Sequence, residues 1–379
     1  MSVWSPVAVI GAGNVGCALA ADLALRGVEV RLFNRSPGRL AAIRDAGGII
    51  VTGQIEGFAP PSLVTGSLEQ AVDGAGVVAV TVPTASLPGY AAALARATSE
   101  EQLIWLNPGH SGGALYLAAG LARAGRGGGR TICQLTTASH ASRLTGPATV
   151  RVFLRPRASL AALPASHLEN CYRRLDALLP GQFGRAESVL EADLANLNAI
   201  LHPPAMVCNA GWIEATAGKF GFYAEGSGPA VARVMDAIDR ERLELARALG
   251  VRAVPFAELF HQLGFTTGQE LHGSGAYHAI RRSELIRPIQ SPPPARPPLP
   301  ARRRRLGTGP LDAPGRGSPQ PGARHHRPDP PGRGDQRHRL PPQRAHPRTH
   351  GTGREDPRRN PRSLRTPATE LAGAPASTA

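Results

Sequence analysis

Three glycines near the start of the chain have the spacing of a phosphate-binding loop. Gly11, Gly13 and Gly16 follow the apolar run Val7–Ile10 and precede an Ala- and Leu-rich segment. In a strand–loop–helix unit the first glycine allows a tight turn, the second lets a pyrophosphate approach the backbone, and the third lets helix and strand pack closely. We expect a dinucleotide site here, rather than a glycine-rich turn that binds nothing. Its predicted contacts are Gly11, Gly13, Asn14, Val15 and Gly16.

A polar pair, Asn34-Arg35, follows the second predicted strand, Val28–Phe33. An acidic residue in this place hydrogen-bonds the ribose hydroxyl of NAD, whereas a nearby arginine accommodates the 2′-phosphate of NADP. The pair therefore favours NADP slightly. Both cofactors stay open, because Asn34 can bond a hydroxyl group and Arg35 can stack on adenine.

Two more loops follow strand-like apolar runs. In a doubly wound parallel sheet, loops at the carboxyl edge contact the ligand. We therefore predict cofactor contacts from Pro83 and Thr84 after one run, and from Asn107 and Gly109 after the next. Pro83 has the alternative role of simply ending its strand. His110 has no base or carboxylate beside it in sequence, so we expect the backbone to satisfy it and expect no catalytic role.

Asn198 and His202 form the most informative polar pair in the second half of the chain. They are four residues apart, so on a helix both side chains project from one face. Pro203-Pro204 is expected to end that helix, which would place His202 at a helix break. A neutral imidazole can donate or accept a proton near pH 7, and the amide can hold a substrate oxygen. The alternative is a buried histidine that only terminates a helix.

The predicted elements around these residues divide the chain into three parts. Strands alternate with helices to about residue 186, and Ala148–Leu154 is expected to be one of those strands, which predicts a doubly wound parallel sheet. Helical periodicity alone follows. We expect an N-terminal Rossmann domain over 1–186, an all-α domain over 187–290, and a disordered tail over 291–379.

The positive charge of the chain lies mostly in that tail. The chain has 379 residues and a formal charge of +15, and residues 291–379 hold 18 arginines against six acidic residues. The tail lacks Phe, Trp, Tyr, Ile, Val and Met, so it cannot bury enough apolar surface to fold. It is either a basic arm or the product of an out-of-frame reading of a GC-rich gene, which the use of arginine almost without lysine would fit.

Cysteine spacing and hydropathy suggest a cytoplasmic protein. The four cysteines, Cys17, Cys133, Cys171 and Cys208, show no metal-binding spacing, so we expect buried free thiols in a reducing compartment and no bound metal. No signal peptide or membrane-spanning run is expected. We expect small-molecule substrates, with no membrane and no nucleic acid as partners. The oligomeric state stays open, a dimer included.

Five segments, in this order, resemble the NAD/NADP octopine/nopaline (opine) dehydrogenase family over about residues 5–290. They are Gly11–Gly16, Asn107–Leu115, Leu197–Pro203, Lys219–Gly226 and Asp239–Arg242. The resemblance implies a nucleotide domain joined to a helical domain. It also implies hydride transfer from NAD(P)H to the imine formed from an amino acid and a 2-oxo acid, and the reverse oxidation.

The same resemblance implies roles for individual residues. His202 would be the proton relay, and Asn198 would line the same pocket; Tyr223 and Glu225 match the family without a role that the sequence reveals. Family members continue with an acidic partner for the histidine, which the tail does not supply. The resemblance therefore implies that residues 187–290 are an incomplete substrate domain, and it favours the out-of-frame reading of the tail. A related two-domain reductase of 2-oxo acids or glycerol phosphate, or an inactive truncated NAD(P)-binding protein, remains an alternative.

Overall fold

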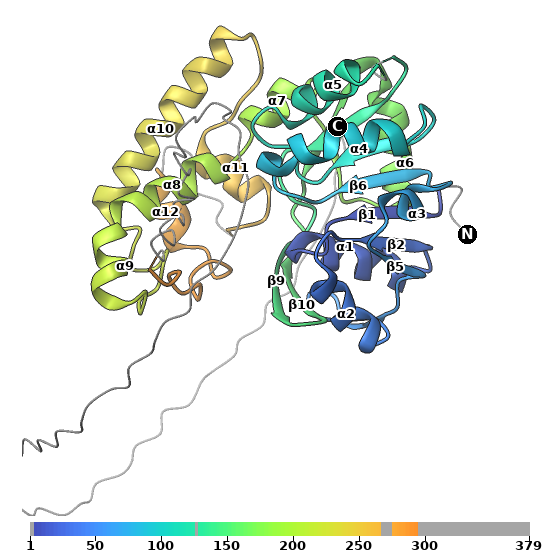
Figure 1. Ribbon diagram of the computed structural model, residues 1–379. Helices are drawn as coiled ribbons and strands as arrows, with labels where there is room; N and C mark the ends of the chain where they lie inside the picture. Colours follow the sequence, from blue (N-terminus) through green and yellow to red (C-terminus); the bar gives the residue numbers. More distant parts are fainter. Residues whose placement is uncertain (1–3, 126–127, 267–274, 295–379) are drawn as a thin grey trace, which may run out of the picture. The chain divides into compact units, whose positions relative to one another are not determined.

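The computed structural model describes residues 4–125, 128–266 and 275–294 (Figure 1). Its main element is an eight-stranded sheet with the order β12-β11-β8-β7-β6-β1-β2-β5. Neighbouring strands run parallel, except β8 and β11. The strands are β1 (Val7–Ile10), β2 (Val30–Phe33), β5 (Leu63–Thr65), β6 (Val77–Val80), β7 (Leu103–Leu106), β8 (Ile132–Leu135), β11 (Ser159–Leu163) and β12 (Gly184–Arg185). This sheet confirms the predicted α/β class.

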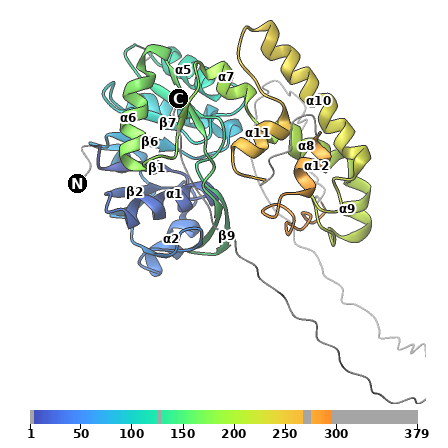
Figure 2. The same cartoon turned by 180° about the vertical axis from the view of Figure 1, so that it is seen from behind.

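Helices cover both faces of the sheet (Figures 1 and 2). Val7 and Val9 of β1 belong to the core beneath α1 and α6, whereas Ala8 and Ile10 belong to the core beneath α3, α4 and α5. Burial on both faces explains why the central strands are continuous apolar runs rather than alternating ones. The helices are α1 (Asn14–Leu25), α2 (Pro37–Asp45), α3 (Leu68–Val72), α4 (Pro88–Ala97), α5 (Gly113–Arg123) and α6 (Leu168–Leu178).

A second sheet has four strands in the order β4-β3-β10-β9. They are β3 (Ile49–Gly53), β4 (Gly57–Ala59), β9 (Ala141–Gly146) and β10 (Thr149–Leu154). The prediction that Ala148–Leu154 joins the large sheet was wrong, because β10 pairs with β3 and β9. Val150 and Val152 are buried while Arg151 and Phe153 are exposed. That alternation is typical of a sheet with one face in water, whereas strands of the large sheet are buried on both faces.

The chain after β12 is helical, as predicted. It forms α7 (Val189–Leu194), α8 (Asn198–Cys208), α9 (Ala210–Thr216), α10 (Pro229–Ala248), α11 (Phe256–Gln262) and α12 (Ala276–Arg281). Val189 and Ala192 of α7 still belong to a core of the large sheet, whereas Leu197 begins a separate core that includes Phe256 and Phe260. The domain boundary at residues 186 and 187 stays a prediction.

Pro203 and Pro204 do not end their helix, contrary to prediction. Both lie inside α8. Each removes one backbone hydrogen bond, and an interior proline costs about 3 kcal/mol. The buried side chains of Ile200, Leu201 and Ala205 in the helical core offset that cost. His202 therefore lies within a helix rather than at a break.

The predicted tail is described only to residue 294. There it contacts the helical part, since Ser291 N donates to Phe220 O at 2.9 Å. The residue before the tail, Gln290, bridges to Gly221. The rest of the predicted disordered tail lies outside the described residues. No helix in the described part of the chain is long and apolar enough to cross a membrane.

The four cysteines are free, as predicted, but not all are buried. Cys17, Cys133 and Cys171 are buried, whereas Cys208 is exposed. The prediction of burial was wrong for Cys208 because it is the last residue of α8, where Met206 and Val207 are exposed as well.

A buried polar chain connects α1 with the loop after β8. Asp22 Oδ2 lies 3.1 Å from His140 Nε2, and Ser139 Oγ lies 2.7 Å from His140 Nδ1. A carboxylate only accepts, so Nε2 carries the ring proton and Ser139 donates to Nδ1. Asn107 Nδ2 in turn donates to Ser139 Oγ at 2.7 Å. The chain fixes Asn107 to the helix that starts at the glycine loop.

This buried chain predicts a loss of stability in acid. Burial alone would raise the pKa of Asp22, but hydrogen bonds from His140 and Arg26 lower it to about 2. A depressed carboxyl pKa stabilises the fold above the unfolded value near 3.8, and the gain is lost between about pH 4 and pH 2. Asp22→Asn should therefore lower the free energy of unfolding by about 2 kcal/mol at pH 7. Urea titrations should show this difference shrinking towards zero near pH 2; a difference that does not depend on pH would contradict it.

Candidate active site

The glycine loop between β1 and α1 has the backbone that a bound pyrophosphate needs. Gly11 has a φ of 114°, a value that favours glycine. A Cβ on Gly16 would lie 1.7 Å from Gly11 O, so no other residue fits there, whereas a Cβ on Gly13 would meet no protein atom. The open space at Gly13 lies at the N-terminus of a 12-residue helix, whose first N–H groups have no partner within the helix.

Asn14 and Val15 begin α1. Val15 is half-buried and Asn14 exposed, yet Asn14 Oδ1 accepts a hydrogen bond from Leu144 N at 2.9 Å. The side chain thereby ties β9 to the glycine loop. A contact of Asn14 with the cofactor stays a prediction.

Asn34 and Arg35 lie beside the same loop. Asn34 Oδ1 accepts from Ala12 N at 3.1 Å, and the Arg35 guanidinium lies 4.8 Å from the centre of the Tyr90 ring. Asn34 therefore fixes the glycine loop itself. Arg35 stacks on a protein ring in this structure, and whether it contacts a cofactor stays a prediction.

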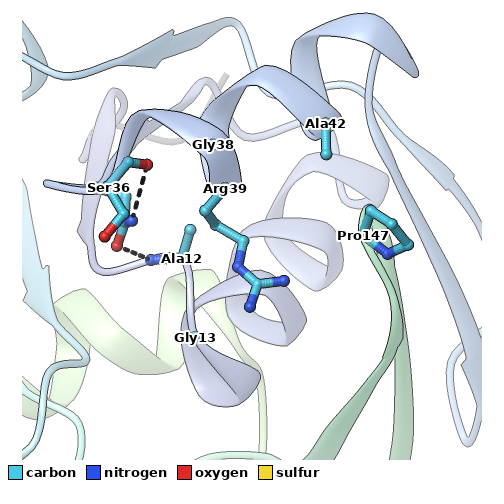
Figure 3. Close-up of a pocket in the computed structure, with 8 residues that line it drawn as sticks. Ala12, Gly13, Ser36, Gly38, Arg39, Ala42 and Pro147 are labelled. Atoms are coloured by element: carbon cyan, nitrogen blue, oxygen red, sulfur yellow. Dashed lines mark hydrogen bonds between the residues drawn. The ribbon is translucent and has the colours of Figure 1, made fainter. Parts of the chain in front are cut away.

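A pocket of about 550 Å³ opens next to these residues (Figure 3). It is lined by Ala12, Gly13, Asn34, Ser36, Gly38, Arg39, Ala42 and Pro147. Arg39 extends from α2 towards Gly13 in Figure 3, and no carboxylate among the described residues pairs with it. The sequence prediction missed Arg39. The available signal was its position four residues after Arg35, in the same segment after β2.

The loops after β6 and β7 are joined to each other. Thr84 Oγ1 donates to His110 O at 2.9 Å, and Pro83 precedes it in extended backbone. Asn107 is fully buried, with both ends of its amide bonded to Ser139. The side chain of Asn107 is therefore used inside the protein, and only its backbone is left for the predicted cofactor contact.

The same loop is too closely packed for a side chain at Gly109. A Cβ there would lie 2.7 Å from Gln134 Cβ. Gln134 also holds the start of α5, because its Oε1 accepts from Ala114 N at 3.1 Å. Gly109 thus has a packing role, and a contact of Gly109 with the cofactor stays a prediction.

His110 bonds a backbone carbonyl, as predicted, and also reaches α8. Its Nε2 lies 3.1 Å from Thr136 O, and its Nδ1 lies 3.4 Å from Asn198 Nδ2. Burial lowers the pKa of His110 to about 4, so the ring is neutral at pH 7. The structure therefore brings the Asn107–Gly113 loop and Asn198 together.

His202 lies one turn after Asn198 on α8 and contacts Tyr223. Tyr223 Oη is 2.5 Å from His202 Nδ1. Burial raises the pKa of Tyr223, with the charge of Arg143 acting in the opposite direction, so the phenol stays protonated. Neighbouring protein atoms desolvate the imidazole of His202 and lower its pKa. Part of the side chain is still exposed to solvent. A neutral imidazole with an open face can move a proton near pH 7.

Other polar residues of the helical part have structural roles. Arg242 is buried, and its guanidinium bonds Asp239 and the backbone of Leu194 and Val254. Glu225 accepts from Gly221 N. No group of three His, Cys, Asp or Glu side chains in the described ranges could hold a metal ion.

Comparisons with known families match both halves of the chain. The model described as "NAD/NADP octopine/nopaline dehydrogenase, alpha-helical domain" matches residues 185–302. The model described as "NADP oxidoreductase coenzyme F420-dependent" matches residues 6–105. The two matches correspond to the helical part and to the first half of the large sheet.

Relatives and solved structures agree with these matches. The opine dehydrogenase of Arthrobacter sp. (strain 1C) is 34% identical over 282 residues, covering 72% of this chain and 77% of that protein. The vitopine synthase of Allorhizobium ampelinum is 27% identical, covering 72% and 74%.

The fold is also similar to an octopine dehydrogenase solved with NADH and agmatine, with a TM-score of 0.61, 21% identity and 76% of each chain covered. A yersinopine dehydrogenase with NADP⁺ bound has the same TM-score at 14% identity, over 76% of this chain and 78% of the other. Together with the Arthrobacter relative and the helical-domain match, this shows that the chain belongs to the NAD/NADP octopine/nopaline (opine) dehydrogenase family and is an NAD(P)-dependent oxidoreductase that acts on CH–NH donors.

Proposed function

We propose that this protein joins the amine of an amino acid to a 2-oxo acid and reduces the resulting imine, with His202 as the proton relay. The observation that carries the proposal is the pair formed by His202 and Tyr223, on the helix that also bears Asn198. The nicotinamide cofactor, held at the glycine loop, supplies the hydride. The protein supplies orientation, a proton path and charge.

Tyr223 allows His202 to work from one ring nitrogen. A phenol hydroxyl can donate to Nδ1 or accept from it. It therefore holds the ring in place both when the imidazole is neutral and when it is protonated. Nε2 is left to take up and release the proton at the substrate. Unlike a carboxylate, the neutral hydroxyl does not raise the pKa of the histidine strongly.

A product with two carboxylates needs positive charge near this pair. Arg242 cannot supply it, because Asp239 and backbone carbonyls use its guanidinium. Arg143 of β9 is exposed, and its charge acts on Tyr223. Its neighbour Leu144 is bonded to Asn14 of the glycine loop. Arg143 is our choice for a carboxylate partner.

An assay with paired substrates tests the proposal. Purified protein with NADPH or NADH is given pyruvate or 2-oxoglutarate together with each member of an amino-acid panel, and nicotinamide fluorescence is followed. We expect oxidation only when amine and 2-oxo acid are both present. Turnover with the 2-oxo acid alone would favour a simple 2-oxo acid reductase, and cofactor binding without turnover would favour an inactive nucleotide-binding protein.

We also infer a preference for NADP, supported by the pocket that contains Arg39. Its guanidinium is the right chemistry for a 2′-phosphate, and a charge-assisted hydrogen bond is worth about 1.5–3 kcal/mol. Arg39→Ala should raise the Kd for NADPH about 10- to 100-fold and leave that for NADH nearly unchanged. Fluorescence titration checks this, with Arg39→Lys as the variant that keeps the charge. An equal loss for both cofactors would contradict the inference.

A further inference from the structure

His110 stands between two partners that determine where its proton lies. Thr136 O is a carbonyl and can only accept, so the Nε2 that lies 3.1 Å from it carries the hydrogen. The ring is neutral at pH 7, because burial lowers its pKa to about 4. A neutral imidazole has one N–H group. Nδ1 therefore presents a lone pair to Asn198.

That lone pair fixes the orientation of the Asn198 amide. An acceptor at Nδ1 requires the NH₂ group of Asn198 to face it, and Nδ2 is the atom found there, at 3.4 Å. The carbonyl Oδ1 is then directed away from His110. No hydrogen bond to Oδ1 is found among the described residues, and Asn198 is exposed. An oriented acceptor is thus free one helical turn before His202.

The loop holds His110 firmly enough to impose this orientation. Thr84 Oγ1 donates to the backbone oxygen of His110 at 2.9 Å. Gly109 packs against Gln134, which is fully buried. The ring therefore has fixed contacts on its backbone side and at Nε2, and Asn198 is the partner that can adjust.

We propose that His110 is a positioning residue that turns the Asn198 carbonyl towards the substrate nitrogen and so selects amines over ketones. The inference rests on the proposed function of Asn198 and His202. An amine or iminium N–H needs an acceptor, which Oδ1 provides. Reduction of a free 2-oxo acid instead builds negative charge on oxygen, which an N–H donor would stabilise. One N–H of Asn198 is used by His110 and the carbonyl oxygen is turned away from the ring, so the amide presents an acceptor there.

Two substitutions separate the contacts of the ring. His110→Gln places a donor near Nε2 and keeps the contact with Thr136, but loses the acceptor at Nδ1. His110→Asn places an acceptor near Nδ1 and loses the contact with Thr136. We expect His110→Gln to raise the KM for the amino acid about tenfold, the size of one lost hydrogen bond. It should also increase turnover of the 2-oxo acid without amine. His110→Asn should keep the KM for the amino acid within about threefold.

A merely structural role gives the opposite pattern. If His110→Asn impairs the enzyme and His110→Gln does not, the ring acts only through Thr136 and the proposal is overturned. The Kd for NADPH and the Tm of both variants, measured on the full chain, separate loss of fold from loss of selection. The KM for the 2-oxo acid should stay unchanged in His110→Gln.

Nitrogen NMR tests the orientation without any turnover. In ¹⁵N-histidine-labelled full-length protein at pH 7, His110 should show a protonated Nε2 and an unprotonated Nδ1. The side-chain amide signals of Asn198 should shift in His110→Gln and less in His110→Asn. A protonated Nδ1 would overturn the inference even if the enzyme is active. A wild-type protein that reduces no imine at all would remove the proposed function instead, and the NMR result would still decide the orientation.

Discussion

His202→Ala should lower kcat for imine reduction by about 10² to 10⁴, the usual contribution of a positioned acid or base. The ring is the group on α8 that can hold a proton at the substrate, and Tyr223 fixes it at 2.5 Å. Cofactor binding should be largely retained, because the residues assigned to the pyrophosphate and the ribose lie on the glycine loop and after β2, and none of them is on α8. Stopped-flow rates and NADPH titrations measure the two effects separately.

One control variant and one variant of intermediate effect accompany His202→Ala. Met206→Ala changes an exposed side chain one turn further along α8 and should leave kcat within about twofold. Tyr223→Phe keeps the ring and removes the hydroxyl, so an intermediate loss of about tenfold is expected. Full activity of His202→Ala would show that the proton comes from elsewhere.

Gly16→Ala should abolish cofactor binding at any practical concentration. The new Cβ would lie 1.7 Å from Gly11 O and 2.6 Å from Thr81 Oγ1, so the loop must leave its position. Because α1 and β1 also lose their close packing, the free energy of unfolding should fall by about 2 kcal/mol or more. Equilibrium titration with NADPH and urea denaturation measure both quantities.

Two further glycines make this result interpretable. Gly211→Ala adds a Cβ in α9 that meets no atom within 4 Å, so binding and stability should be retained. Gly13→Ala also meets no protein atom, so it should preserve the fold and weaken cofactor binding alone. Normal NADPH affinity in both Gly13→Ala and Gly16→Ala would mean that the pyrophosphate does not lie on this loop.

Local sequence patterns predicted the parts of the protein that depend on neighbours in the chain. The glycine loop is one example, because turn, helix start and strand all fall within 20 residues. The four-residue spacing of Asn198 and His202 is another, since it places both on one face of any helix. Each of these features needs little information about the rest of the fold.

Features that depend on distant contacts were not predictable in this way. Pro203 and Pro204 contradict a local rule because burial of α8 offsets the lost hydrogen bonds. Tyr223 meets His202 only after the intervening chain has folded, although the resemblance had already singled it out. The role of Arg39 depends on the packing of α2 beside the glycine loop, so its place shortly after Arg35 in the sequence was only a weak signal.

The most direct test of imine reduction by this protein follows two labels into one product. NADPH carrying deuterium at the transferred position is mixed with a ¹⁵N-labelled amino acid, an unlabelled 2-oxo acid and the protein, and the products are analysed by mass spectrometry. We expect one secondary amine that contains both the deuterium and the ¹⁵N, and we expect the His202→Ala variant to form it far more slowly. Deuterium in a 2-hydroxy acid without nitrogen would contradict imine reduction.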